Sequence, residues 1–172
     1  LADRIRAQVG TMEQIPLSDG EVDFIWFRDA LEYSVSVRGT LQECRRVLRI
    51  GGYLLLHSGY ATNRVSAWEK DLICQMLGLQ SDSLDVGLTE RELLGAGFDI
   101  LRHENLGSEL AEFYELKYER CSRELLRLAR LLRRPAWFKE QLGNKAYDVA
   151  LGVYHWTIYQ LLGKIEYRTF LA

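Results

Sequence analysis

The sequence has few histidines and cysteines, the residues that bind zinc or form disulfides. Its 172 residues include three histidines and three cysteines, and no Cys/His pair has the spacing of a zinc site. We therefore expect no metal centre. The cysteines, Cys44, Cys74 and Cys121, are odd in number and far apart. That pattern favours reduced thiols and a cytoplasmic protein.

Long apolar runs and an excess of one charge are also missing. No run approaches the roughly 20 apolar residues that a membrane-spanning helix needs, and no basic, apolar leader typical of a signal peptide is visible. The formal net charge is −2, so nothing global indicates nucleic acid or an anionic membrane as a partner. The composition is that of a globular protein, and the length allows one domain with a real core.

Residues 19–58 contain the clearest pattern, which predicts a strand, a loop, a helix and a second strand. An apolar, aromatic-rich run at 22–27 follows a turn at Asp19-Gly20, and a second apolar run covers 53–57. Two buried strands joined by a helix form a βαβ unit, so we expect the strands to be parallel.

The helix between these runs begins near Ser36. Its apolar face consists of Val37, Leu41, Cys44 and Leu48, which recur at helical spacing. We expect Gly51-Gly52 to end this helix as a left-handed C-cap.

Three segments of the sequence carry a resemblance to a known family. The segments IPLSDGEVDFI (15–25), DALEY (29–33) and LQECRRVLRIGG (41–52) resemble, in order and spacing, the centre of a class I S-adenosylmethionine-dependent methyltransferase. A later stretch, from Leu88-Thr89 to Ala96-Gly97-Phe98, matches the same family in the right order. The chain departs from the family at Ile50, where proline is usual, and at Tyr33, where many members have histidine.

The resemblance implies a Rossmann-like α/β fold. We expect a mostly parallel sheet with an antiparallel last strand, helices on both faces, a helical lid insertion, and the N-terminal strands absent. Residues 1–107 would be the C-terminal part of the methyltransferase core, 108–163 the lid, and 164–172 the final core strand.

Several local elements follow from the remaining patterns. The expected strands are 4–10, which the resemblance identifies as the third strand of the family, 98–103 and 164–171. The expected helices are 65–77, a short one opened by a capping box at Thr89–Glu92, one long helix from Ser108 to about 132, and 145–162, with a loop from Pro135 to Gly143.

The glycine-rich loop and acidic residue that bind the cofactor in this family would precede residue 4, and no such loop follows an early strand here. Without the first strands, the strand at 22–27 would have one open edge, which favours aggregation. The chain is therefore a piece of a longer protein, or another chain completes its sheet, or it is a degenerate member that no longer binds cofactor.

Candidate site residues follow from their place in the family pattern. For S-adenosyl-L-methionine, the resemblance implies contacts from Thr11 and Met12 near the adenine, and from Phe27 and Arg28 near the methionine portion. Tyr33 and His57 are the candidate catalytic residues. Tyr60, Tyr114 and Tyr159 are the candidate substrate-binding residues. For each of these residues the alternative is a purely structural role, in a turn, at a strand edge or in the core.

We expect a methyltransferase acting on a small-molecule amine, hydroxyl or carboxylate, with neither nucleic acid nor membrane as partner. Methyl transfer from a sulfonium needs alignment and exclusion of water more than a fixed set of catalytic groups. The alternative is a non-catalytic, methyltransferase-like binding or assembly module.

Overall fold

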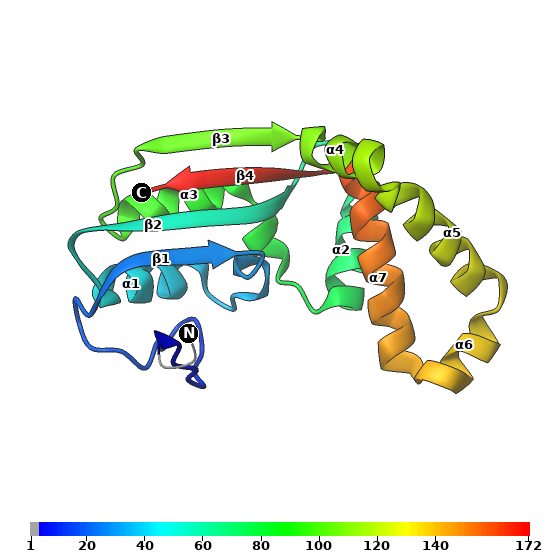
Figure 1. The fold of residues 1–172 in the computed structure, drawn as a ribbon, viewed down its shortest axis with the longest axis horizontal. Helices are drawn as coiled ribbons and strands as arrows, with labels where there is room; N and C mark the ends of the chain where they lie inside the picture. Colours follow the sequence, from blue (N-terminus) through cyan, green and yellow to red (C-terminus); the bar gives the residue numbers. More distant parts are fainter. Residues whose placement is uncertain (1–3) are drawn as a thin grey trace.

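The structure, a computed structural model, describes residues 4–172 and has a four-stranded sheet of order β1-β2-β4-β3 (Figure 1). The strands are β1 (Val22–Arg28), β2 (Leu48–Ala61), β3 (Arg102–Gly107) and β4 (Ile165–Leu171). β1 and β2 are parallel, and β4 is antiparallel to both β2 and β3. The predicted fold class, a mostly parallel sheet with an antiparallel last strand, is confirmed.

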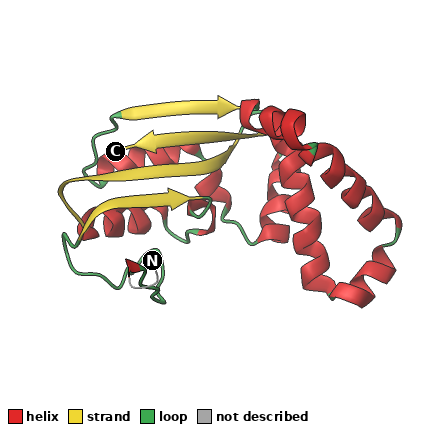
Figure 2. Cartoon of the chain, viewed as in Figure 1, coloured by secondary structure: helices red, strands yellow, loops and turns green. Residues whose placement is uncertain are grey.

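Helices cover one face of the sheet and extend beyond one of its ends (Figure 2). They are α1 (Val37–Val47), α2 (Ala67–Leu77), α3 (Val86–Gly95), α4 (Glu109–Tyr118), α5 (Arg120–Arg133), α6 (Pro135–Leu142) and α7 (Asn144–Leu161), with 3-10 turns η2 (Leu31–Tyr33) and η3 (Ser81–Leu84). α4 to α7 lie between β3 and β4 in the sequence and form the group at the right of Figure 1.

The main core lies between the sheet and helices α1 and α3. Leu41 of α1, Leu93 of α3, Leu56 of β2 and Phe170 of β4 are all fully buried there. On the opposite face, α7 covers only the end of the sheet. Farther back on β1 that face leaves Phe24 and Trp26 exposed at 51% and 65%, so a second helical layer is incomplete within the described residues.

Helix α1 forms as predicted but ends earlier than expected. Its N-cap is Ser36, whose side chain accepts a hydrogen bond from the Gly39 N–H. The helix ends at Val47 and β2 begins at Leu48, so the predicted C-cap at Gly51-Gly52 is wrong. Leu48 reaches the same core from an extended backbone and is 3% exposed.

The two glycines instead let β2 pass close to β1. Gly51 has φ +76°, and a Cβ on Gly52 would lie 2.9 Å from the Asp23 carbonyl oxygen. At the same place the register jumps, because Val22 pairs with Leu48 whereas Phe24 pairs with Tyr53. A side chain would not fit there, which explains the small residue.

The strand predicted at 4–10 is wrong. Residues 5–10 have no regular secondary structure, and Ile5 and Val9 are 74% and 99% exposed. Among the described residues β1 pairs with β2 alone, so no strand is available beside this segment. An isolated extended segment leaves its backbone groups to water and gains no ladder.

The capping box is at another helix than predicted. Thr89 lies inside α3 and is fully buried, while Asp85 caps that helix by accepting from the Gly87 N–H at 2.8 Å. The true capping box joins Ser66 and Glu69 at the start of α2. Spacing alone did not separate the two.

The helical insertion has more breaks than predicted. The single helix expected from Ser108 is interrupted at Glu119, which has φ +51° and separates α4 from α5. The expected loop at 135–143 contains α6, which starts with Pro135 at its first position. The predicted strand at 98–103 begins later, at Arg102, because Phe98 turns into the core.

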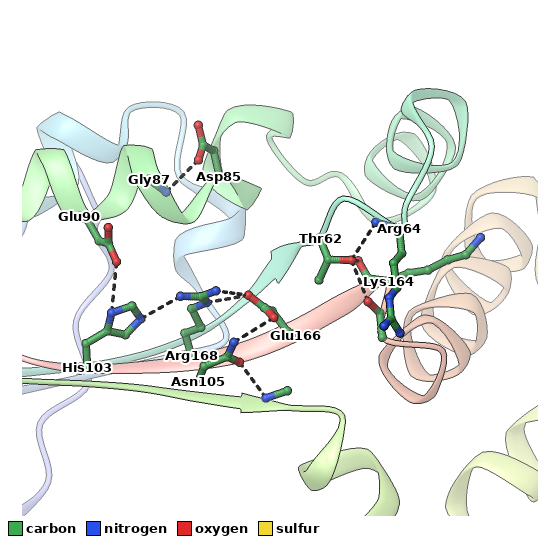
Figure 3. A network of polar contacts seen from close by, with 12 residues as sticks. Thr62, Arg64, Asp85, Gly87, Glu90, His103, Asn105, Lys164, Glu166 and Arg168 are labelled. Atoms are coloured by element: carbon green, nitrogen blue, oxygen red, sulfur yellow. Dashed lines mark hydrogen bonds and ion pairs between the residues drawn. The ribbon is translucent and has the colours of Figure 1, made fainter.

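A polar network joins β3, β4 and α3 (Figure 3). Glu90 and Arg168 contact the two ring nitrogens of His103, with Nδ1 3.1 Å from Glu90 Oε1 and Nε2 3.3 Å from Arg168 Nη1. A guanidinium can only donate, so Nε2 is the acceptor and Nδ1 carries the proton. His103 also stacks on Phe170 at 4.1 Å. These contacts account for His103 as a structural residue.

Within 4–172, no helix is both long and apolar enough to cross a membrane. In the same range, no group of three or more His, Cys, Asp and Glu side chains is placed to hold a metal ion.

Candidate functional site

The carboxyl ends of β1 and β2 lie side by side. Arg28 pairs with His57 in the parallel register, and the Asp29 N–H donates to the His57 carbonyl oxygen at 2.9 Å. Asp29 then adopts φ +47°, which turns the chain out of the sheet toward η2. Figure 1 shows α2 and α7 beyond these strand ends. The loop after β1 therefore faces the helical insertion.

The loop after β1 brings a carboxylate under the end of β2. Glu32 is only 4% exposed, and its Oε1 accepts a hydrogen bond from the Gly59 N–H at 2.7 Å. Its other oxygen, Oε2, is buried and has no hydrogen-bond partner in the protein. The backbone carbonyl of Glu32 accepts from the Gln80 N–H at 2.8 Å. This carboxylate is firmly held yet half unsatisfied.

Above Glu32 lies a cavity of about 140 Å³, which we call the strand-end cavity. It is lined by Asp29, Glu32, Tyr33, Leu77, Leu79, Arg120, Val153, Trp156, Thr157 and Tyr167. The lining comes from the loop after β1, from the end of α2, from α5 and α7, and from β4. Segments far apart in the sequence thus meet at one end of the sheet.

Trp156 closes the cavity over β2. A Cβ on Gly59 would lie 2.5 Å from Trp156 Cζ2, so the indole rests directly on the backbone at Gly59. Its Nε1–H donates to the Tyr167 hydroxyl at 3.3 Å. Tyr167 in turn stacks on His57, with ring centroids 4.8 Å apart and planes 10° apart. One hydrogen bond and one ring stack thus connect Trp156, Tyr167 and His57.

Burial and the carboxylates of Asp29 and Glu32 shift the pKa values of groups in the cavity lining. Burial raises the pKa of the Glu32 carboxyl, although the hydrogen bond from Gly59 opposes the rise. Burial, then the charges of Glu32 and Asp29, raises the pKa of the Tyr33 phenol. Burial, then the charge of Asp29, raises the pKa of the Tyr167 phenol. Both phenols therefore stay protonated near neutral pH and can donate hydrogen bonds.

His57, a predicted catalytic residue, lies behind the cavity. It does not line the cavity, because the Tyr167 ring stacks on it. Its Nδ1 is 2.9 Å from Thr169 Oγ1. Burial, opposed by Asp29 and aided by Arg28, lowers its pKa, so the neutral imidazole is favoured.

The other predicted catalytic and substrate residues lie in different places. Tyr33 lines the cavity and is half exposed. Tyr60 is fully buried in the main core on the opposite face of the sheet, with its hydroxyl unpartnered. Tyr60 therefore lies away from the strand-end cavity, because alternation along β2 points its side chain away from the His57 face. Its role as a substrate contact stays a prediction.

Tyr114 and Tyr159 lie in the helical insertion but do not line the cavity. Tyr114 carries the Arg120 guanidinium over its ring at 5.5 Å, so it borders the cavity through Arg120. Tyr159 is 7% exposed and packs in a second core beside α2, with its hydroxyl 3.5 Å from Glu69 Oε1. For Tyr114 and Tyr159 a direct substrate contact stays a prediction.

The predicted cofactor residues fall into two groups. Phe27 points its side chain into the main core and Arg28 is exposed at the end of β1. Thr11 and Met12 lie in a turn in which the Gln14 N–H donates to the Thr11 carbonyl oxygen at 3.2 Å.

Glu13 fastens that turn to the loop that follows Tyr33. Its Oε1 accepts from the Val35 N–H at 3.0 Å and from the Ser34 hydroxyl at 3.2 Å. The two groups of predicted cofactor residues are thus attached to the same loop region between β1 and α1.

Sequence reasoning missed Glu32 and Tyr167, two of the residues that define the cavity, and left Trp156 out of the candidate substrate-binding residues. Glu32 stood in the polar patch after the first buried strand, and its position at a strand's carboxyl end was an available signal. Trp156 gave a weak signal, since aromatic residues on the helices of the insertion can hold a cationic amine, although packing of those helices explained it equally simply. Tyr167 looked like an ordinary strand residue and gave none.

Comparisons with known proteins agree with this geometry. Residues 1–56 match a family model described as a methyltransferase domain. The sarcosine/dimethylglycine N-methyltransferase of Aphanothece halophytica is 27% identical over 119 residues, which cover 69% of this chain and 39% of that protein. The chain thus spans about two fifths of this curated relative.

Two solved structures share the fold over 99% of the chain. The [4+2]-cyclase SpnF aligns with a TM-score of 0.71 at 18% identity and is covered over 56% of its length. Geranyl diphosphate C-methyltransferase from Streptomyces coelicolor A3(2) aligns with a TM-score of 0.61 at 16% identity and is covered over 52% of its length.

The matched segment contains β1, the loop with Glu32, α1 and most of the apolar run of β2. With the strand order and directions, this match supports the resemblance of the chain to class I S-adenosylmethionine-dependent methyltransferases.

Proposed function

We propose that the protein containing this chain transfers a methyl group from S-adenosyl-L-methionine to a small-molecule acceptor. The observation that carries the proposal is the strand-end cavity, where buried Glu32 and half-exposed Tyr33 meet under α5 and α7. Open α/β sheets bind ligands at this edge. The relative from Aphanothece is named for N-methyl transfer, and the Streptomyces structure is titled as a complex with S-adenosyl-L-homocysteine.

The end of β1 has groups that fit part of the cofactor. The Arg28 side chain is 55% exposed and lies 3.2 Å from Asp29, so its remaining donors are free to bind the carboxylate of the methionine portion. We assign that contact to Arg28 and backbone contacts to Phe27, and we assign Thr11 and Met12 to the adenine. When bound, the cofactor supplies a methyl group attached to a sulfonium.

The residues of this chain would then hold the acceptor and keep water out. We assign to Tyr33 a hydrogen bond to the acceptor, which its position in the cavity lining supports, and Trp156 covers the sheet side of the cavity. An acceptor that must lose a proton needs a base within hydrogen-bond reach. Glu32 lines the cavity whereas His57 lies behind Tyr167, so Glu32 is the better placed base and His57 remains the second candidate.

The domain division is part of the same proposal. We assign residues 1–107 and 164–172 to the core and residues 108–163 to a lid. Its support is that Arg120, Val153 and Trp156, all from the insertion, line the cavity. A further chain or N-terminal segment that completes the sheet beside β1 remains a proposal, as does the cytoplasmic location expected from three unpaired cysteines.

A binding or assembly module without methyl transfer is the second candidate. One solved neighbour is titled a [4+2]-cyclase rather than a methyltransferase, and a fold does not fix its chemistry. In addition, the segment predicted as the third strand of the family forms no strand here. Under this candidate the cavity would bind a ligand without changing it.

The test is a methyl-transfer screen over amine, hydroxyl and carboxylate acceptors, with cofactor binding measured separately by calorimetry. We expect Tyr33→Phe to lower the rate at least tenfold with some acceptor, because the phenol donor is lost, and Tyr53→Phe, an exposed tyrosine of β2, to leave it unchanged. His57→Ala is included for the second candidate base. Cofactor binding without turnover of any acceptor would favour the binding module.

A further inference from the structure

The strand-end cavity carries more negative than positive charge. Asp29 and Glu32 bring two carboxylates to its lining, and Arg120 is the one cation among the lining residues. The Arg120 Nε lies 3.1 Å from Glu124 Oε1 on the same helix. Its charge is therefore balanced from outside the cavity. Asp29 is paired in the same way with Arg28 at 3.2 Å, so Glu32 is the carboxylate that leaves a negative field in the cavity.

Glu32 makes this field strong because it is removed from water. The residue is 4% exposed, and Oε2 has no hydrogen-bond partner in the protein. Burial of an incompletely paired carboxylate is unfavourable, which is why the pKa of Glu32 is raised. A cation in the cavity would supply the missing partner charge.

Aromatic side chains supply the rest of the lining. Tyr33, Trp156 and Tyr167 face the cavity, and the faces of such rings attract cations. The hydrogen bond from Trp156 to Tyr167 and the stacking of Tyr167 on His57 hold the rings in place. The volume of about 140 Å³ is close to that of a cavity of about 150 Å³ that accepts benzene, so a compact head group fits.

We propose that the strand-end cavity binds the cationic head of an amine, with the ammonium against the rings of Tyr33 and Trp156 and near the carboxylates of Asp29 and Glu32. The inference rests on the proposed function in taking this amine as the methyl acceptor, whereas the binding itself needs no cofactor. An acceptor bound as an ammonium gives its N–H proton to a carboxylate, here Glu32, which leaves a nitrogen lone pair and a neutral carboxylic acid.

The experiment compares choline with its neutral isostere 3,3-dimethyl-1-butanol by isothermal titration calorimetry in the absence of cofactor. We expect choline to bind at least tenfold more tightly. Glu32→Gln keeps the size and an acceptor for the Gly59 N–H but removes the charge, so it should weaken choline binding at least tenfold and leave the alcohol unchanged. Trp156→Leu should weaken choline several-fold more than the alcohol.

The matched control is Glu140→Gln, which removes the same charge from exposed α6 and should change neither affinity. Asp29→Asn provides a second variant at an exposed position, and circular dichroism checks that each protein is folded. Equal affinities for the two ligands, or no choline binding by folded protein, would overturn the inference.

The two proposals fail in different ways. Methyl transfer to hydroxyl acceptors without any choline preference would refute the amine site and leave the proposed function standing. Choline preference in a protein that methylates no acceptor would support the amine site and contradict the proposed function.

Discussion

Replacing Gly59 with alanine should separate the Trp156 indole from β2. The added Cβ would lie 2.5 Å from Cζ2 and 3.1 Å from Cη2 of that ring. Carbon atoms pack at about 3.5–4.0 Å, so the indole must move by roughly 1 Å or more. It would then lose its place above the sheet and its 3.3 Å hydrogen bond to Tyr167.

The expected loss of stability follows from overpacking. Inserting a methyl group into a packed site typically costs about 1–3 kcal/mol. For a chain of this size, about 1 kcal/mol lowers Tm by roughly 2–4 °C. We therefore expect Gly59→Ala to lower the unfolding free energy in urea by about 1–3 kcal/mol and to change the tryptophan fluorescence of the folded state.

A double-mutant cycle tests the cause. Gly59→Ala combined with Trp156→Leu should be less destabilised than the sum of the single changes by about 1 kcal/mol or more, because the clash has been removed. The control is Gly95→Ala at the end of α3, where the nearest atom to a new Cβ is 3.9 Å away. Additive effects at Gly59 and Trp156 would refute the contact.

Three further changes test separate parts of the structure. Glu32→Gln should raise the unfolding free energy at pH 7 by on the order of 1 kcal/mol. The folded pKa of Glu32 is raised, so wild-type stability falls as pH rises from the unfolded value through the folded one. The gain should therefore vanish near pH 4, and urea unfolding at both pH values checks it; a pH-independent gain would contradict the burial argument. Glu13→Ala removes the acceptor of the Val35 N–H and should cost about 1 kcal/mol at pH 7 in the same assay. Burial raises the pKa of Glu13, but hydrogen bonds from its own backbone, Ser36 and Val35 outweigh burial and lower it. The stability lost in Glu13→Ala should therefore shrink as pH falls below the ordinary carboxyl pKa; a loss that does not change with pH would contradict those bonds. Trp26→Lys places a charge on β1, which is an edge strand among the described residues, and should reduce self-association measured by sedimentation. The reason is that an exposed apolar edge strand favours pairing with another chain; unchanged association would show that β1 is not involved.

Much of the fold could be read from local patterns. Periodicity predicts the apolar runs of β1 and β2 and the buried face of α1 between them. The helical connection between the two strands makes them parallel. The last strand also follows from alternation. The failures at 4–10 and at Gly51-Gly52 share a cause, since a strand needs a neighbour and a glycine's role depends on which backbone passes it.

The sequence by itself determined where the chain turns from strand to helix and back, and the polar loop after β1 in which Glu32 lies. Only the tertiary structure decided what surrounds that carboxylate. The Gly59 N–H that binds Glu32 is 27 residues away along the chain, Trp156 comes from the last helix of the insertion, and Tyr167 comes from the strand that follows it. No periodicity encodes such a meeting, because it depends on strand order, on the register of β2 against β4, and on a glycine that leaves room for an indole.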